Sequence, residues 1–307
     1  MFRQVSKVAG LVLAVFGSLA MPGCSNQPEV PKPNATAQET GTGAKTTAEE
    51  PKKAGGKKQI TNSLGMTFIY CPSGSFTMGS PAAEKSRLDN EAQVLVTISK
   101  GFYLGKTSVT QAQFKAVMGA TPWSGKVFVK EGDDYPATYV DWNDAAECCR
   151  KLTARESQAD RLPQGYVYAL PTEAQREYAC RAGTTTAYSF GNDPIALGDY
   201  AWWGGFIGDG SCKTELYAHR VGQKQPNPWG FCDLHGNVWE WCRDYYTEKL
   251  PGGTDPLVAS GSFRVNRGGG WIIGAGDCRS AHRDDNPPED RGNNLGFRVA
   301  LVLYSAT

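Results

Sequence analysis

The spacing of apolar residues predicts three short helices in this chain. Each begins at a side chain that can accept a hydrogen bond from the first helical turn, namely Thr110, Asp141 or Thr172. Gly119 and Gly183 mark the ends of the first and third helices. Apolar residues of the second helix recur at the spacing of one helical face: Ala145, Cys148, Cys149 and Leu152.

Strand signals are short and scattered. Residues 67–78 predict two strands around a Pro-Ser-Gly turn, residues 94–98 a weakly alternating strand, and residues 297–304 a closing strand. Between residues 191 and 292 the chain is dense in Gly, Asp, Asn and Trp, with little clear periodicity and no fixed-period repeat. Few helices, short strands and a long loop-rich half predict an α+β domain held by side-chain networks.

The first 23 residues have the pattern of an export signal. Arg3 and Lys7 supply basic charge before residues 8–19, an apolar run too short for a usual membrane span. The run leads into Met-Pro-Gly-Cys, which resembles a bacterial lipobox and predicts that Cys24 is the lipidated first residue of the mature chain. The alternative is a plain secretory signal with an incidental cysteine.

Residues 24–58 are expected to form a disordered tether between the lipidated cysteine and a domain at residues 59–307. They are rich in Pro, Ala, Thr, Lys, Glu and Gly, and Val30 is their one large aliphatic residue. Such a segment cannot bury enough apolar surface to offset the entropy of ordering. Either signal predicts an exported protein, in a compartment where disulfides can persist. The lipobox predicts in addition that the protein is lipid-anchored in the membrane of the bacterial cell envelope.

Composition narrows the classes of partner. The chain holds 32 basic and 31 acidic residues, and 8 basic and 4 acidic residues belong to the first 58 positions. The domain therefore carries 24 basic and 27 acidic residues. Neither the net charge of the whole chain nor that of the domain favours nucleic acid as a partner. The 36 glycines of the whole chain fit a fold rich in turns, and its 3 histidines exclude a site built from many histidines.

Ordered motifs run through nearly all of residues 59–304. They are NSLGM (62–66), GSFTMGS (74–80), LPTEAQ (170–175), NPWG (227–230), DLHGNVWEW (233–241), RGGGW (267–271) and NLGFR (294–298). In this order the set resembles the formylglycine-generating enzyme family, also called sulfatase-modifying factor. The resemblance implies a C-type-lectin-like α+β fold with little regular secondary structure, in agreement with the hydrophobic pattern.

The resemblance also implies an oxidase chemistry for which this chain lacks residues. Members that mature sulfatases convert a sulfatase cysteine to formylglycine with O₂ and with copper(I) held by two cysteines, and soft thiolates suit that ion. That pair follows the Arg-Gly-Gly-Ser motif, where this chain has Gly270 for the serine and Ile273 at the first metal position. Cys278 remains, and it is a catalytic candidate with Cu⁺ only if the oxidase alternative holds.

Cys278 has a second interpretation from the same resemblance. The residues after it match the segment that follows a structural cysteine, whose family partner corresponds to Cys180. This match implies a Cys180–Cys278 disulfide, whereas an ungapped count places Cys278 at the second metal position. Without Cys24 the domain keeps 8 cysteines, an even number that favours disulfides or buried thiols. The sequence contains no CxxC pair, which argues against a zinc site.

A calcium site is the other metal site that the resemblance implies. Hard Ca²⁺ prefers several oxygen ligands, and residues 233–240 offer two carboxylates that bracket a Gly-Asn turn. The resemblance places side-chain ligands at Asp233 and Glu240 and carbonyl ligands at Gly236 and Val238. The alternative is that the two acids cap local backbone.

Two functions follow for the domain. The family scaffold and export favour a formylglycine-generating oxidase with a sulfatase as partner, whereas the missing cysteine pair favours a catalytically degenerate binding protein. Residues 272–292 keep framework positions with unusual residues between them, a layout that resembles the variable segment of ligand-binding members. We therefore expect a membrane-tethered member that binds a small ligand or a protein partner through its lectin-like surface.

Overall fold

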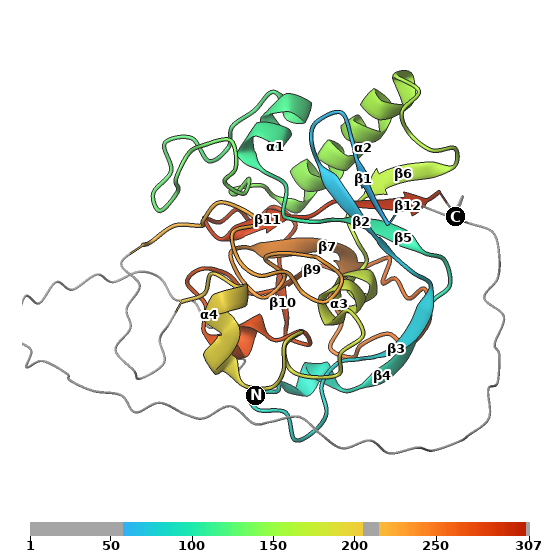
Figure 1. The fold of residues 1–307 in the computed structure, drawn as a ribbon, viewed down its shortest axis with the longest axis vertical. Helices are drawn as coiled ribbons and strands as arrows, with labels where there is room; N and C mark the ends of the chain where they lie inside the picture. Colours follow the sequence, from blue (N-terminus) through green and yellow to red (C-terminus); the bar gives the residue numbers. More distant parts are fainter. Residues whose placement is uncertain (1–57, 205–214, 305–307) are drawn as a thin grey trace, which may run out of the picture. The chain divides into compact units, whose positions relative to one another are not determined.

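Three β-sheets organise the part of the chain that the computed structural model describes, residues 58–204 and 215–304 (Figure 1). The largest sheet has five strands, all in antiparallel pairs. In spatial order they are β1 (Gln59–Thr61), β2 (Thr67–Cys71), β5 (Phe102–Gly105), β12 (Ala300–Leu303) and β6 (Tyr166–Ala169). Strands from both ends of the domain therefore meet in one sheet.

The second sheet lies largely in the region where the sequence pattern predicted little regular structure. Its four strands are β10 (Arg283–Asn286), β9 (Arg264–Arg267), β7 (Trp239–Tyr245) and β11 (Leu295–Phe297). Most residues of β7 and β9 are buried, and the buried set includes charged side chains. Alternation of apolar and polar residues therefore cannot reveal these strands, because polar residues also point inward.

A third sheet and several helices complete the fold. Its strands are β3 (Gly74–Met78), β4 (Val94–Ile98) and β8 (Gly253–Thr254). The α-helices are α1 (Gln111–Met118), α2 (Trp142–Gln158), α3 (Glu173–Arg181) and α4 (Leu197–Tyr200). Short 3₁₀ helices are η1 (Asp89–Glu91), η2 (Pro194–Ala196) and η3 (Ala275–Cys278).

The three predicted helix starts are confirmed. Thr110 and Thr172 each form a capping box with the glutamine three residues later, and the Asp141 carboxylate accepts the N–H of Asp144 at 2.8 Å. Gly119 ends α1 with a φ of 71°. The four apolar residues predicted to share one face of α2 are all buried.

The predicted closing strand over residues 297–304 is wrong in its middle. β11 ends at Phe297 and pairs with β7, whereas β12 begins at Ala300 and pairs with β5 and β6. Between them the Arg298 side chain is fully buried and reaches a carboxylate of the second sheet. The segment therefore passes from one sheet to another at a buried arginine, which interrupts a single strand.

Two large hydrophobic clusters lie around these sheets. One joins α1 and α2 to the five-stranded sheet, and Phe114 of α1 contacts Phe297 of β11 with ring centroids 6.1 Å apart. The other lies beneath α3, which packs against β3, β7 and β9 (Figure 1). The second cluster places α3 against the centre of the four-stranded sheet.

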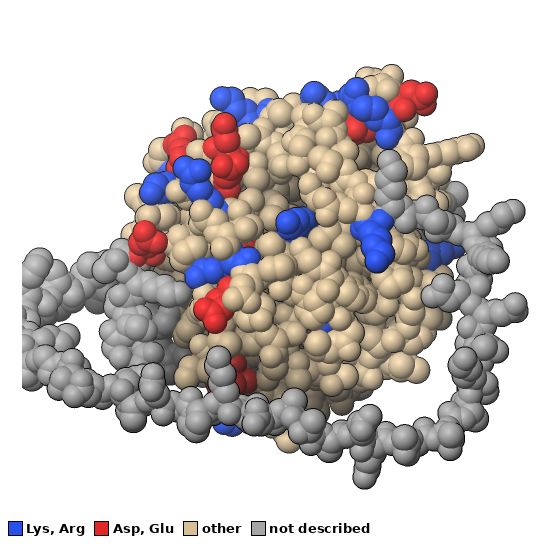
Figure 2. All heavy atoms as spheres, in the orientation of Figure 1, with Lys and Arg blue, Asp and Glu red and all other residues tan. Residues whose placement is uncertain are grey.

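The predicted signal at residues 1–23, the lipidation site at Cys24 and the tether up to residue 57 lie outside the described residues. Within residues 58–204 and 215–304, no helix combines the length and the apolar composition needed to cross a membrane. On the face drawn in Figure 2, Lys and Arg side chains alternate with Asp and Glu, mainly over the upper half. That face therefore presents charges of both signs.

Removal of the cap of α3 tests whether this helix start contributes to stability. We expect Thr172→Ala to lower the free energy of unfolding by about 1 kcal/mol, because the N–H of Gln175 loses its side-chain acceptor. Thr172→Ser keeps a hydroxyl at this position and should keep most of the stability. Equilibrium urea unfolding measures both variants, and an equal loss in the two would contradict the capping role.

Candidate functional site

A fully buried carboxylate stands at the start of β7. Glu240 accepts hydrogen bonds from Nε of Arg298 at 3.0 and 3.1 Å and from Nη2 of Arg176 at 3.2 Å. Ser108 donates to the same carboxylate at 2.7 Å. Burial alone would raise the pKa of Glu240, but the two guanidinium groups outweigh it and hold the pKa below its ordinary value.

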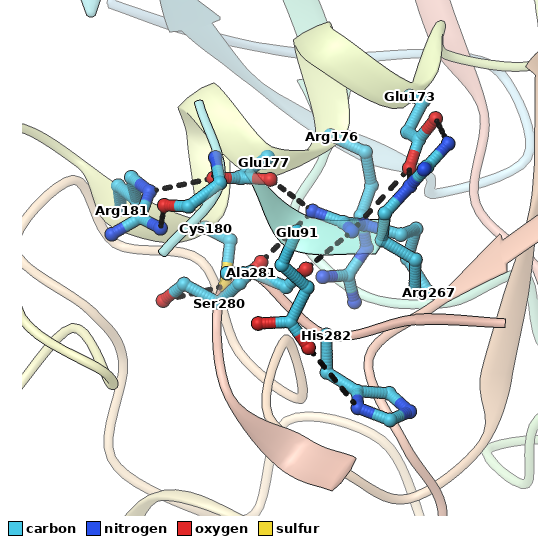
Figure 3. Close-up of polar contacts among 12 residues, drawn as sticks. Glu91, Glu173, Arg176, Glu177, Cys180, Arg181, Arg267, Ser280, Ala281 and His282 are labelled. Atoms are coloured by element: carbon cyan, nitrogen blue, oxygen red, sulfur yellow. Dashed lines mark hydrogen bonds and ion pairs between the residues drawn. The ribbon is translucent and has the colours of Figure 1, made fainter. Parts of the chain in front are cut away.

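Helix α3 carries two further buried carboxylates (Figure 3). Glu177 pairs with Arg181 at 2.8 Å and with Arg267 of β9, and it accepts the N–H of Gly79 at 2.8 Å. Glu173 accepts from Nη2 of Arg283 at 2.8 Å. One helix therefore holds β9 and β10 through ion pairs and the loop after β3 through a hydrogen bond from the backbone.

Three of the predicted calcium ligands, Asp233, Gly236 and Val238, lie in the loop before β7, and the fourth, Glu240, lies in β7 itself. Asp233 adopts a φ of 60°, and its Oδ2 accepts the N–H of Gly222 at 2.7 Å. Its Oδ1 is buried without a hydrogen-bond partner in the described part of the chain. Burial raises the pKa of Asp233 to about 6.

All seven cysteines within the described ranges are buried, and no disulfide joins any two of them: Cys71, Cys148, Cys149, Cys180, Cys232, Cys242 and Cys278. Cys212 lies outside the described residues. The structure therefore does not form the Cys180–Cys278 disulfide that the sequence comparison implied. The Cys180 sulfur instead lies 3.7 Å from Nε2 of His235 and 3.7 Å from Oγ of Ser280.

The environment of Cys180 affects its acidity. Burial raises the pKa of this thiol, but His235 and Arg176 outweigh burial and lower the pKa to about 6. His235 itself bonds to backbone and hydroxyl groups, with Nδ1 2.9 Å from the Cys278 carbonyl oxygen and Nε2 3.1 Å from the Ser189 N–H. These bonds give His235 a structural position between two loops.

Cys278 is enclosed. Its side chain has no solvent exposure and packs in a small cluster with Tyr188, Leu197 and Ala275. A Cβ placed at Gly269 would lie 2.6 Å from the Cys278 sulfur, which shows how closely the backbone covers it. Ile273, at the first predicted metal position, supplies no thiolate.

The segment at residues 272–292 separates buried and exposed positions. Arg279 and Arg283 are buried and pair with glutamates, whereas Asp284 and Ile272 are exposed. His282 is buried between them, with its ring 5.6 Å from the ring of Trp239. The framework positions therefore anchor the segment, and residues between them reach the surface.

Comparison with known proteins agrees with this architecture. Residues 54–303 match the model of the sulfatase-modifying factor enzyme 1-like domain. The chain belongs to this family. A formylglycine-generating enzyme from Streptomyces coelicolor is 27% identical over 292 residues, which cover 76% of this chain and 88% of that protein.

Two other similarities, one to a curated protein and one to a solved structure, extend the comparison. An inactive C-alpha-formylglycine-generating enzyme 2 from Bos taurus is 32% identical over 192 residues, which cover 59% of this chain and 54% of that protein. The solved structure of Treponema denticola variable protein 1 is similar with a TM-score of 0.66 and 27% identity, covering 79% of this chain and 98% of that one. The predicted lectin-like α+β fold is thereby confirmed.

The residues of this family member do not fit the implied calcium site. Both oxygens of Glu240 already accept from Arg176 or Arg298, so a Ca²⁺ ion would meet two fixed positive charges. The Gly236 carbonyl accepts the N–H of Val238 at 3.0 Å.

Several side chains at this site could not be recognised in advance. Arg176 and Arg298 lie within the family motifs, but nothing in their spacing identifies Glu240 as their common partner. A cavity of about 200 Å³ beside β2 and α1 is lined partly by Lys106, Thr107 and Asp134. No sequence pattern places Asp134 beside Lys106 and Thr107.

Neutralising Glu240 tests the buried ion pairs. We expect Glu240→Gln to lower the free energy of unfolding by about 3–5 kcal/mol, because Arg176 and Arg298 then keep buried charges without a counterion. Glu147→Gln is the matched control, since Glu147 pairs with Arg150 on the exposed face of α2 and should matter little. Urea unfolding measures both, and similar effects would contradict the account.

Asp233 should make stability depend on pH. Its folded pKa of about 6 lies above the ordinary value of 3.8, so the folded state keeps a proton that the unfolded state releases. The free energy of unfolding should therefore fall by about 3 kcal/mol from this group as the pH rises from 3.5 to 7. Asp233→Asn should flatten this part of the profile, measured in EDTA, whereas the exposed control Asp160→Asn should not. Parallel profiles for wild type and Asp233→Asn would exclude a raised pKa.

Proposed function

We propose that this protein is a binding member of the sulfatase-modifying factor family that has lost copper-dependent oxidation. The proposal includes attachment to the bacterial cell envelope through a lipidated Cys24 at the end of the tether. The observation that carries it is the run from Gly270 to Cys278, which contains a single thiol where the oxidase chemistry requires two. Ile273 cannot replace a thiolate as a ligand for Cu(I).

The position of Cys278 supports the loss of chemistry. Its sulfur lies beneath backbone and apolar side chains without solvent exposure, so a peptide substrate cannot reach it in this structure. The other described thiols are buried as well. The relative from Bos taurus, whose name calls it inactive, agrees with a family in which scaffold and oxidation can separate.

The surface supports binding as the remaining role. Arginines at framework positions of residues 272–292 hold the segment to the core, while Ile272 and Asp284 face solvent. A loop anchored in this way can change its exposed residues at little cost to the fold. We infer that this surface, beside Trp239, binds a protein partner or a small ligand.

The second candidate function is a formylglycine-generating oxidase. The similarity to the Streptomyces coelicolor enzyme over most of both chains favours it. Under this alternative Cys278 would be the one thiol available for copper, and a sulfatase would be the partner. The absence of a second cysteine in that run is the specific observation against it.

A direct assay separates the two functions. The full chain in detergent is loaded with Cu(I) and given O₂ and a peptide with the sulfatase cysteine motif, beside an active formylglycine-generating enzyme. We expect no aldehyde above background by mass spectrometry from this chain, because a single enclosed thiol does not hold the copper. Formation of aldehyde by wild type that is lost in Cys278→Ala would overturn the proposal.

A further inference from the structure

Two carboxylates face a buried imidazole nitrogen beneath the exposed part of the 272–292 segment. Nδ1 of His282 lies 3.6 Å from Oδ1 of Asp277 and 3.7 Å from Oε1 of Glu91. These separations are too long for hydrogen bonds, and Nδ1 is buried without a partner among the described residues. Figure 3 shows His282 with its ring turned towards Glu91.

The three groups span the range from core to surface. The Glu91 side chain has no exposure, the His282 side chain is 8% exposed, and the Asp277 side chain is 50% exposed. Asp277 in η3 therefore forms the outer wall of the cluster, and Glu91 in η1 forms its inner wall. Trp239 lies against the imidazole from β7.

His282 is neutral in this cluster, and its tautomer sets whether Nδ1 donates or accepts a hydrogen bond. Burial lowers the pKa of His282 to about 3, so the ring is neutral at ordinary pH, and its Nδ1 accepts a hydrogen bond when Nε2 carries the proton. Burial also raises the pKa of Asp277. In the Nε2–H tautomer the buried Nδ1 lacks a hydrogen-bond donor among the described residues, whereas the Asp277 carboxylate beside it is half-exposed to solvent.

The neighbouring arginine cannot supply the missing donor. Arg279 uses its Nε–H on the Gly276 carbonyl at 2.7 Å. Its two terminal nitrogens donate to Glu84 at 2.6 Å, to Ser86 at 2.6 Å, and to Glu91 at 2.8 and 2.7 Å. All five N–H groups of the guanidinium are thereby engaged, and none remains for His282 or Asp277.

The charge on the surface around the cluster is negative and favours a cationic ligand. Residues 277–290 contain five acidic residues and two arginines. Both arginines, Arg279 and Arg283, are buried and paired with glutamates. The exposed surface of this segment, which includes Asp277 and Asp284, therefore carries uncompensated negative charge.

We propose that the site formed by Asp277 and His282 binds the ammonium group of a lysine side chain on a partner protein. An ammonium presents three N–H donors, which suit the Asp277 carboxylate and the Nδ1 acceptor of the Nε2–H tautomer of His282, and its charge is opposite to that of Asp277. The four-carbon stem of lysine can pass the half-exposed Asp277 and reach towards the buried imidazole. This assignment rests on the proposed binding function and names the chemistry of its ligand.

Two capped tripeptides test the assignment: acetyl-Gly-Lys-Gly-amide and its norleucine analogue, which keeps the stem and lacks the ammonium. The full chain in detergent, labelled with ¹⁵N at histidine, reports binding through the His282 nitrogen signals. We expect the lysine peptide to shift these signals and to bind at least about tenfold more tightly than the norleucine peptide. Equal affinities, or no shift with millimolar lysine peptide, would overturn the proposal.

Variants then locate the site. Asp277→Asn keeps the size of a half-exposed side chain and should weaken the lysine peptide by about tenfold, whereas Asp160→Asn, an exposed acid after α2, should leave its affinity unchanged. Unaltered binding by Asp277→Asn would overturn the assignment. The aldehyde assay tests the proposed function separately. If the chain forms no aldehyde but binds both peptides equally, only the lysine site is refuted. If it forms aldehyde and still prefers the lysine peptide, only the loss of oxidation is refuted.

Discussion

Buried pairs of carboxylate and guanidinium hold the loops of this domain in one arrangement. Glu91, Glu173, Glu177 and Glu240 are all at most 1% exposed, and each meets at least one arginine that is at most 2% exposed. Such pairs add little net stability compared with apolar packing, because desolvation offsets the attraction. A wrong arrangement would leave a buried charge unpaired, so the pairs select one path for a chain that has little regular structure.

Helix α3 is the centre of this network. Its nine residues include Glu173, Arg176, Glu177 and Arg181, all of them buried. Their partners come from β9, β10 and β7 and from the loop after β3. The same constraint fixes the candidate site, because Glu240 is held by Arg176 and Arg298 and is not available to a metal ion. It also anchors the 272–292 segment and leaves its intervening residues to face solvent.

The parts of this fold that follow local rules could be predicted from the sequence. Helix starts at Thr110, Asp141 and Thr172 depend on a side chain and the next turn, and all three are as expected. Strands β7, β9 and β10 were missed because their buried positions include charged residues, which hides the period of two. The family motifs identified the α+β fold, since their order reflects the whole chain.

The candidate site was predictable only in its components. The sequence singled out Glu240 and Asp233. The partners of Glu240, Arg176 and Arg298, lie 64 and 58 residues away along the chain, and a local sequence pattern cannot predict pairs at such a separation. The same holds for His282, whose neighbours Glu91 and Trp239 come from distant elements. Cys278 shows the converse case, because the absence of a second thiol beside it is a property of the sequence alone.

The affinity for Cu(I) is the measurement that tests the central claim most directly. The full chain and Cys278→Ala are titrated without oxygen against a chromophoric chelator that competes for Cu(I). If the domain has lost its copper site, the two proteins withdraw the same amount of copper from the chelator. One additional equivalent of tightly bound Cu(I) in wild type, absent from Cys278→Ala, would show that Cys278 still takes part in a copper site and would contradict the account.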